Sequence, residues 1–178
     1  LALLNQNFCD AVFIPKIDEM ESLSNVNIDL SNLDNVMEGK FRPGHFKGVT
    51  EIVYRLFSVV NPDYAFFGEK DFQQIMVIQK MVKQLKLSVQ IVSAPIIRES
   101  NGLAMSSRNS KLSFTARERA GFIFEVLKSY LPENRDVLVR KLEGFGFELE
   151  YLEEYELGSG KRLFIAGFLE GVRLIDNV

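Results

Sequence analysis

The first half of the chain contains two long segments in which apolar residues recur every three or four positions. They cover residues 44–60 and 70–86. This spacing places the apolar side chains on one face of a helix, so both segments are predicted to be amphipathic helices that pack on a core. The expected inward residues are Phe46, Val49, Ile52, Val53, Leu56, Phe57 and Val60 in the first helix, and Phe72, Ile75, Met76, Ile78, Met81, Val82 and Leu85 in the second.

Short apolar runs flank these helices. Residues 11–15 (AVFIP), 64–68 (YAFFG) and 88–95 (SVQIVSAP) are each predicted to be a buried strand. A short helix ended by Gly39 is predicted over 33–40. Strand, helix and strand in this order form a parallel βαβ unit, so the first half is predicted to be α/β.

The pattern changes after Pro95. Residues 96–113 read as a loop that could include a short strand over 96–99, and two helices are predicted at 115–130 and 132–144. Three apolar or alternating runs follow, at 147–156, 162–170 and 172–175, with Gly171 at the last turn. Helices followed by antiparallel strands indicate a separate α+β layer. The boundary is placed at 95–98, which divides the chain into domains 1–96 and 97–178.

Composition favours a packed globular protein, because 47% of the residues are hydrophobic. Nine basic and eleven acidic residues precede Pro95, and twelve basic and thirteen acidic residues follow it. Neither half has the basic excess expected of a nucleic-acid binder. No apolar run in the sequence reaches the roughly 18 residues of a membrane span. We therefore expect neither nucleic acid nor membrane as a partner.

The chain has a single cysteine, Cys9, and a single histidine, His45. An intramolecular disulfide is excluded, and a zinc site made of protein ligands alone is disfavoured. A reducing cytoplasm is the expected compartment. The sequence begins with Leu1 rather than methionine, in what reads as the last turn of a helix, so the protein is expected to start earlier.

Residues 66–74 (FFGEKDFQQ) join a predicted strand to a predicted helix. Ligands of parallel sheets bind at the carboxyl ends of strands, and the free N–H groups of a helix start attract anions. Lys70 lies at that positive end, where a cation is unfavourable unless a negative group is near. An anion site and a simple glycine turn with a solvated lysine both remain open.

The motif RPGHF, residues 42–46, raises the same question. Lys40, Arg42 and Lys47 surround the start of the first long helix, where positive charge is unfavourable by about a few tenths of a kcal/mol or more. They suggest a bound anion, although solvated cations beside a helix started by Pro43 are the favoured interpretation of the motif alone. His45 could be structural, a hydrogen-bond donor to a substrate, or an acid–base group.

The loop at 98–111 concentrates polar side chains between apolar segments. Serine hydroxyls and a forked guanidinium make a phosphate-binding set, and the Asn101-Gly102 turn would let the loop fold over a ligand. An exposed serine-rich turn is the alternative. The polar residues are Arg98, Ser106, Ser107, Arg108 and Lys111. Glu99 and the acidic residues Glu148, Glu150, Glu153, Glu154 and Glu156 are predicted to form a solvated face rather than a metal site.

Taken together, three segments carry a family resemblance. RPGHFKGV (42–49), FFGEKDFQQ (66–74) and GLAMSSRNSKLS (102–113), in this order and spacing, closely resemble the pantothenate synthetase (pantoate:β-alanine ligase) family. The terminal RLIDNV (173–178) resembles the end of that family's last strand. Each motif is short, but their conjunction is specific, and the resemblance covers essentially all 178 residues.

The resemblance implies an ATP-dependent ligase with a Rossmann-like nucleotidyltransferase fold. Pantoate would attack the α-phosphorus of ATP to form pantoyl adenylate and pyrophosphate, and the amine of β-alanine would then displace AMP to give pantothenate. The chain would hold the second half of the Rossmann-like domain, with parallel strands, followed by a small α+β lid domain with an antiparallel sheet.

The resemblance also implies roles for individual residues. ATP contacts are implied at Gly68, Glu69, Lys70, Asp71, Ile97, Met105, Ser106, Ser107 and Arg108, the last four in a mobile loop that closes on the triphosphate. Pantoate would contact Gln74, and Arg42 and His45 would line the active-site wall. Catalysis would rest on positioning and charge stabilisation, supported by Lys70, Ser106, Ser107 and Arg108. Magnesium would bridge phosphate oxygens, without a dedicated protein metal site.

The chain departs from the family in one respect. The paired-histidine HxGH motif and first strand of family members have no counterpart in these residues, so negligible activity is expected of this chain alone. The full-length protein is expected to be a homodimer. One alternative is a nucleotide-binding or interaction fragment without catalysis. An adenylyl-transferring relative with another acceptor is the weaker alternative, because Gln74 would have no role in it.

Overall fold

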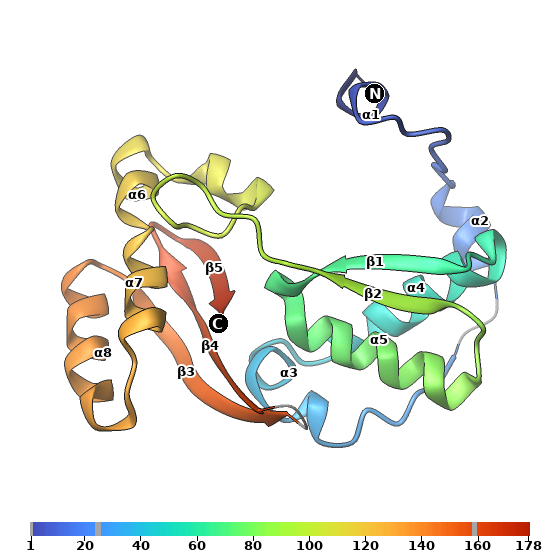
Figure 1. Ribbon diagram of the computed structural model, residues 1–178. Helices are drawn as coiled ribbons and strands as arrows, with labels where there is room; N and C mark the ends of the chain where they lie inside the picture. Colours follow the sequence, from blue (N-terminus) through green and yellow to red (C-terminus); the bar gives the residue numbers. More distant parts are fainter. Residues whose placement is uncertain (1, 24–25, 158–159) are drawn as a thin grey trace.

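The computed structural model describes residues 2–23, 26–157 and 160–178 and contains two separate sheets (Figure 1). Strands β1 (Tyr64–Gly68) and β2 (Gln90–Ala94) pair in parallel, with Tyr64 opposite Gln90. Strands β3 (Glu148–Leu157), β4 (Gly160–Leu169) and β5 (Val172–Asn177) form an antiparallel sheet in the order β3-β4-β5. The predicted fold class, a parallel α/β unit followed by an antiparallel α+β unit, is confirmed.

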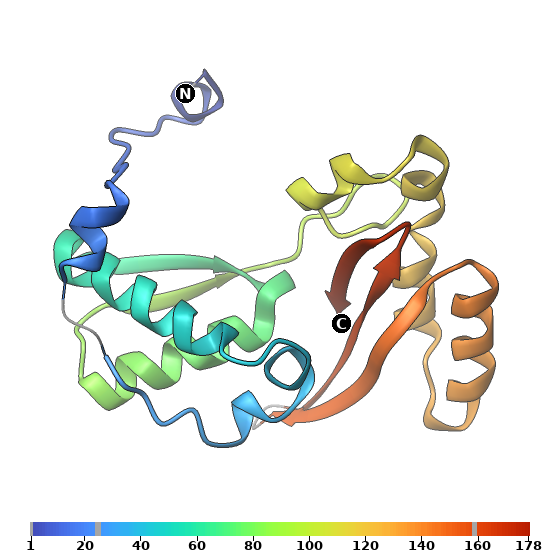
Figure 2. The same cartoon turned by 180° about the vertical axis from the view of Figure 1, so that it is seen from behind.

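Helices α4 (His45–Val60) and α5 (Phe72–Leu85) complete the parallel unit. Both views place them on the same side of the two-stranded sheet (Figures 1 and 2). Their apolar faces meet in a core that includes Phe46, Val53, Val77, Ile78 and Met81, all at most 9% exposed. The βαβ prediction is confirmed because helical spacing and strand length agree with this packing.

Some predicted inward positions are nevertheless exposed. Ile52 and Val60 on α4 are 41% and 54% exposed, and Tyr64 and Phe66 on β1 are 56% and 71% exposed. The expectation of a fully buried β1 is wrong for one of its faces, because both long helices cover the opposite face. An apolar period shows which side chains share a face but not whether another element covers it.

The predicted strand at 11–15 is wrong. This segment is coil between the short helices α1 (Ala2–Gln6) and α2 (Ile17–Glu21), and it extends away from the rest of the molecule (Figure 1). Phe13 and Ile14 are 52% and 78% exposed. A strand needs a hydrogen-bonding neighbour, and this segment pairs with neither sheet of the described chain.

The predicted helix at 33–40 is divided into a 3₁₀ turn, η1 (Ser31–Asp34), and α3 (Met37–Phe41). Gly39 does not end the helix but lies inside it. A Cβ atom there would collide with the Leu33 carbonyl, so glycine is required for the close approach of η1 and α3.

Three helices pack on the antiparallel sheet: α6 (Phe114–Arg119), α7 (Phe122–Ser129) and α8 (Arg135–Gly144), the last preceded by η4 (Pro132–Asn134). Their core includes Val126, Leu142, Leu152 and Ile165. The helix predicted at 115–130 is broken at Gly121, where a Cβ atom would collide with the Asn101 carbonyl. Close contact with the preceding loop therefore divides the helix.

The segment 96–113 is less irregular than expected. The strand predicted at 96–99 is reduced to one bridge between Arg98 and Ala104, and Ser107–Lys111 forms a 3₁₀ helix, η3. The chain passes from the first sheet to the second along this segment (Figure 1). The division into domains 1–96 and 97–178 stays a prediction.

None of the helices within the described ranges is long and apolar enough to cross a membrane.

Candidate active site

The turn from β1 into α5 lies at the carboxyl end of the parallel strands. Gly68 ends β1, and Glu69–Asp71 form a single 3₁₀ turn, η2, directly before α5. The Lys70 side chain is 19% exposed, and its ammonium nitrogen lies 4.0 Å from a carboxylate oxygen of the half-exposed Asp71. A cation and a helix start therefore lie together at the edge where parallel sheets bind ligands.

The last strand of the chain holds this turn in place. The side-chain amide of Asn177 donates to the carbonyl oxygens of Glu69 and Lys70, at 2.9 and 3.1 Å. Arg162 donates to Asn177 Oδ1 at 2.6 Å and to a Glu69 carboxylate oxygen at 3.3 Å. Asn177 is 1% exposed, so its amide is shielded from water. Sequence reasoning missed Asn177 and Arg162, although the resemblance of RLIDNV drew attention to the segment that contains Asn177.

Two adjacent glutamines on α5 have different surroundings. Gln73 is 3% exposed; its oxygen accepts from the Glu38 N–H and its nitrogen donates to the carbonyls of Leu33 and Val36. Gln73 therefore fixes the segment before α4 to α5. Both glutamines line the adjoining cleft, but the Gln73 amide is occupied by these backbone groups, whereas Gln74 is only partly buried and is the one placed to meet a ligand.

His45 is positioned by the turn at RPGHF. Gly44 precedes α4 with a φ of 78°, a conformation that favours glycine, and His45 is the first residue of the helix. Its ring lines the same cleft as Gln74. Partial burial, and next the Arg42 guanidinium, lower the pKa of His45 below its ordinary value. At neutral pH the imidazole is therefore uncharged and can donate or accept one hydrogen bond.

The serine loop begins with exposed side chains. Met105 and Ile97 are 54% and 65% exposed, and the Ile97 carbonyl accepts a hydrogen bond from the Met105 N–H at 2.9 Å. Ser106 caps η3, because its hydroxyl accepts from the Arg108 N–H at 3.2 Å. Ser107 and Arg108 are exposed in the first turn of η3. This segment thus presents two serines and a guanidinium on an ordered turn.

Buried bonds anchor that turn. Asn109, 1% exposed, donates to Glu99 at 2.7 Å and to the Ala104 carbonyl at 3.1 Å. Arg98 does not belong to the phosphate-binding set that the sequence suggested. Its guanidinium makes two bonds to the Asp176 carboxylate, at 2.6 and 2.9 Å, and lies 3.7 Å from the Phe124 ring centroid. Arg98 therefore fastens the loop to β5.

Two adjoining cavities meet at Lys70. The first is lined by His45, Lys70, Asp71 and Gln74, and the second by Lys70 and Ser106 together with Asn109 and Asp176. The structure thus brings five of the predicted site residues, Lys70 included, into the lining of these two cavities. The other predicted residues do not line these two cavities: Arg42, Gly68, Glu69, Ile97, Met105, Ser107 and Arg108.

A buried ionic cluster adjoins both cavities, because Glu38 and Tyr151 line the first and Arg173 lines the second. The Glu38 carboxylate accepts from Arg173 at 2.7 and 2.9 Å, from the Tyr151 hydroxyl at 2.7 Å and from Arg42 at 3.3 Å. Arg173 also donates to Glu150 at 2.7 Å, so Glu150 is not part of a solvated acidic face as predicted. Nothing in the local sequence pattern indicated this cluster, because its members come from α3, β3 and β5.

The cluster keeps its charges despite burial. Burial alone would raise the pKa of Glu38, but hydrogen bonds from Arg173 and Tyr151 outweigh it and leave the pKa lowered. Burial, and next the Glu38 charge, raise the pKa of the Tyr151 hydroxyl well above its ordinary range. Burial opposes the charge of Arg173, yet Glu38 and Glu150 raise its pKa. Glu38 and Arg173 are therefore an ion pair, and Tyr151 is a neutral donor.

Within the described ranges, no three His, Cys, Asp or Glu side chains are grouped so as to hold a metal ion. Of the two acidic residues in the turn, Glu69 is paired with Arg162, while the Asp71 carboxylate is half-exposed. The site therefore offers anion-binding groups and one accessible carboxylate.

A family model described as pantoate-beta-alanine ligase matches residues 1–178. The chain belongs to the pantoate-beta-alanine ligase family. This confirms the resemblance carried by the three motifs, and with it the assignment to ligases that form a C–N bond.

Named relatives agree with this assignment. Pantothenate synthetase of Christiangramia forsetii is 42% identical over 189 residues, which cover 94% of this chain and 67% of the relative. Pantothenate synthetase of Legionella pneumophila strain Corby is 41% identical over 179 residues, which cover 99% of this chain and 68% of the relative. Similarity to pantoate-beta-alanine ligases thus extends along nearly the whole chain.

Solved structures of the family have the same fold. Pantothenate synthetase from Thermus thermophilus superposes with a TM-score of 0.91 at 34% identity, covering 99% of this chain and 72% of that one. Pantoate-beta-alanine ligase from Francisella tularensis, solved in complex with beta-gamma ATP and beta-alanine, superposes with a TM-score of 0.87 at 34% identity. The latter covers 99% of this chain and 67% of its own length.

Proposed function

We propose that the cavities around Lys70 bind ATP and pantoate for the two-step ligation of pantoate to β-alanine. A pantoate carboxylate oxygen attacks the α-phosphorus and pyrophosphate leaves, which gives pantoyl adenylate. The β-alanine nitrogen then attacks the acyl carbon, loses a proton, and AMP leaves with the bonding electrons. The observation that carries this proposal is that Lys70 lies between a cavity with Gln74 and His45 and a cavity with Ser106.

The side chains at each cavity suit one half of the reaction, and the cavities of about 20 and 10 Å³ mark only where these side chains meet. A carboxylate with hydroxyl groups can be oriented by an amide and a neutral imidazole, which are the groups that Gln74 and His45 offer. Phosphate oxygens suit the Lys70 ammonium, the backbone of Gly68–Asp71 and the hydroxyl of Ser106. Lys70 would then lie near the phosphorus at which charge develops, where a fixed cation lowers the barrier.

Ser107 and Arg108 would complete the phosphate site from the exposed turn of η3. Arg108 is near enough to His45 for its charge to contribute to the lowered pKa of the imidazole. Met105, which is exposed, and the Ile97 backbone would contact the nucleoside. Arg42, whose guanidinium is bonded to Glu38, would line the active-site wall and keep a positive charge near His45.

The residues of the turn fit a magnesium ion that binds together with the nucleotide. Magnesium binds proteins through one or two carboxylates plus substrate phosphates, and the Asp71 carboxylate is the accessible oxygen donor. When bound, the ion neutralises charge on the phosphate oxygens. Lys70, Ser106 and Arg108 would share that task from the protein side.

Two further properties belong to the proposal. A cytoplasmic location is supported by the exposed free thiol of Cys9, which a reducing compartment would preserve. A homodimer of the full-length protein is supported by family membership alone. A nucleotide-binding or interaction role without catalysis is the alternative function, favoured if ATP binds and the full-length protein forms no AMP.

The test is ATP binding to this chain by calorimetry, with Lys70→Met and Arg108→Ala as variants. Loss of a charge-assisted phosphate contact should weaken binding by roughly tenfold or more. Lys83→Met, an exposed cation near the far end of α5, is the matched control and should bind as the parent chain does. Equal affinity in the parent chain and the Lys70 variant would overturn the proposal.

A further inference from the structure

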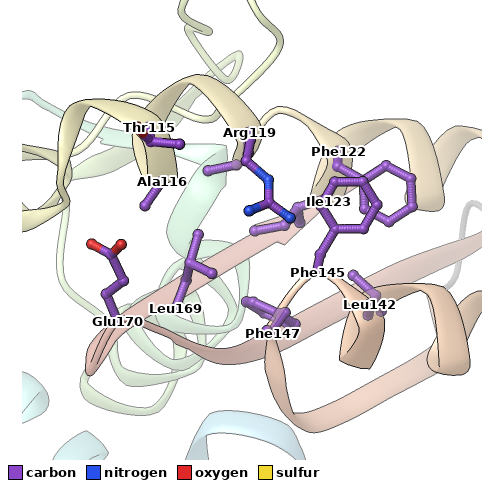
Figure 3. A pocket seen from close by; sticks show the side chains of 12 residues that line it. Thr115, Ala116, Arg119, Phe122, Ile123, Leu142, Phe145, Phe147, Leu169 and Glu170 are labelled. Carbon is purple, nitrogen blue, oxygen red and sulfur yellow. The ribbon is translucent and has the colours of Figure 1, made fainter.

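An apolar pocket lies in the antiparallel unit, between α6, α7, the end of α8 and β4 (Figure 3). Its cavity volume is about 160 Å³. The floor is formed by side chains that are at most 9% exposed: Ala116, Ala120, Ile123, Leu142, Phe147 and Leu169. The activity proposed above uses none of these residues.

The size and lining of the pocket define the body of a ligand. An engineered cavity of about 150 Å³ lined by aliphatic and aromatic side chains stays dry and binds benzene. This pocket has nearly the same volume and a buried lining of aliphatic and aromatic side chains, and it opens to solvent where the exposed Thr115, Arg119 and Glu170 line it. It therefore suits an apolar group about as large as one six-membered ring.

One cation enters the pocket. Figure 3 shows the Arg119 guanidinium projecting between Leu169 and Phe145. The guanidinium carbon lies 4.9 Å from the Phe145 ring centroid, and Phe145 is itself stacked on Phe122 with ring centroids 4.1 Å apart. The ring stack restrains the position of the charge without using its N–H donors.

No ion pair among the described residues includes Arg119, although a carboxylate lies at the rim of the pocket. That carboxylate, of Glu170, accepts bonds from the Ser113 N–H at 3.0 Å and the Ser113 hydroxyl at 2.8 Å. Its oxygens are thus directed to the start of α6. Arg119 remains the group with donors directed at the cavity.

From this arrangement we infer that the pocket binds a small monocarboxylate whose apolar body is about the size of a benzene ring. The body fills the space above Ile123, Leu142 and Leu169, and the carboxylate accepts hydrogen bonds from Arg119. The site is separate from the cavities around Lys70. It adjoins them, however, because Ile123 also lines the cavity that contains Lys70 and Ser106.

Benzoate is the probe for the test, with benzyl alcohol and benzylamine as equally sized neutral and cationic controls. Binding to the 178-residue chain is followed through methyl NMR resonances of Ile123, Leu142 and Leu169. Benzoate should shift these resonances, benzyl alcohol should bind at least about tenfold more weakly, and benzylammonium should not bind. Equal affinities for the three probes, or no shift with benzoate at millimolar concentration, would overturn the inference.

Two variants test the geometry. Arg119→Met keeps a long apolar side chain and should weaken benzoate binding at least about tenfold, whereas Arg140→Met on the exposed face of α8 should leave it unchanged. Ala120→Leu, which fills the floor, should abolish benzoate shifts while circular dichroism shows an intact fold. Unchanged binding in the Arg119 variant, or competition of benzoate with ATP, would show that the site is not the one described.

Discussion

The ammonium group of Lys70 owes its position to a residue 107 positions later in the chain. Asn177 donates to the backbone of the turn that carries Lys70, and Arg162 holds both Asn177 and Glu69. The lysine supplies the charge, but the C-terminal strand decides where that charge lies. At the residue scale the site is therefore a product of both sheets.

Replacing Asn177 by alanine should impair nucleotide binding through the position of Lys70. The change leaves the Glu69 and Lys70 carbonyl oxygens without the amide and removes one of the bonds of Arg162, which costs about 1–3 kcal/mol of folding free energy. ATP affinity should fall several-fold in calorimetry performed well below the unfolding temperature.

The Asn134→Ala substitution at the end of η4 is the control, because it removes an amide that bonds only local backbone groups. It should lower stability slightly and leave ATP affinity unchanged. A stable Asn177→Ala chain with full ATP affinity would show that Asn177 does not position Lys70.

At the scale of elements, the buried cluster around Glu38 connects α3 to β3 and β5. Tyr151 comes from β3 and Arg173 from β5, and both bond the Glu38 carboxylate. Met37 packs beside this cluster with Tyr151 and Phe164. A five-residue helix is too short to be stable alone, so these contacts, together with the Gln73 bond to the Glu38 N–H, hold α3 in place.

The Glu38 cluster should make stability depend on pH in the acid range. The pKa of Glu38 is lower in the folded chain than its ordinary value of 4.5. The Glu38 carboxylate therefore contributes fully to the free energy of unfolding above pH 4.5. This contribution is lost as the pH falls through the folded pKa, because protonation breaks the ion pair with Arg173. Urea unfolding of the parent chain should show a steeper acid loss than that of Glu38→Gln.

Glu133→Gln, an exposed position in η4, is the matched control and should keep the acid dependence of the parent chain. The acidic residues Glu99 and Glu170, whose pKa values are also lowered by Arg117 and Ser113 respectively, are common to all three proteins. Parallel pH profiles for the parent chain and Glu38→Gln would contradict the predicted linkage.

Two phenylalanines of the parallel unit lie in opposite environments, one in the core and one on the open face of the sheet. Phe46 on α4 is 1% exposed, whereas Phe66 on β1 is 71% exposed. Phe46→Ala should lower the free energy of unfolding by about 3–5 kcal/mol, and Phe66→Ala by less than about 1 kcal/mol. Denaturant titrations measure both, and similar losses would show that the open face of β1 is covered in solution.

At the scale of the whole molecule, the Lys70 site is assembled where the two units meet. The α3 segment and the η2 turn contact β3 and β5, and Figure 2 shows α3 beside the end of the antiparallel sheet. The chain spans 67% of the Christiangramia forsetii relative and 72% of the Thermus thermophilus structure. Membership of the family therefore does not by itself show that this chain is active.

Negligible synthetase activity of the 178-residue chain stays a prediction. The physical reason is that His45 is its only histidine, so a paired-histidine motif cannot stabilise the phosphate transition state. AMP formation is measured with ATP, pantoate, β-alanine and magnesium, with the Thermus thermophilus enzyme as positive control. AMP formation that requires both pantoate and β-alanine would contradict the prediction.

Local patterns predicted much of the fold. The spacing in 44–60 and 70–86 predicted α4 and α5, and the short runs predicted β1, β2 and the antiparallel strands, because periodicity reports which side chains share a face. The same reasoning failed at 11–15, where an apolar run has no partner strand within the described chain. It also failed at Gly39 and Gly121, where contact with the backbone of another element or loop explains the glycine.

The sequence by itself determined the family, the two kinds of layer and the residue types of the site, since motifs such as FFGEKDFQQ and helical periods are local properties of the chain. Only the tertiary structure decided that the buried Gln73 amide is bonded to backbone groups of η1 and α3, that Arg98 binds Asp176, and that Asn177 fixes the Lys70 turn. The physical reason is that burial and hydrogen-bond partners depend on elements far apart in the sequence, which no local pattern specifies.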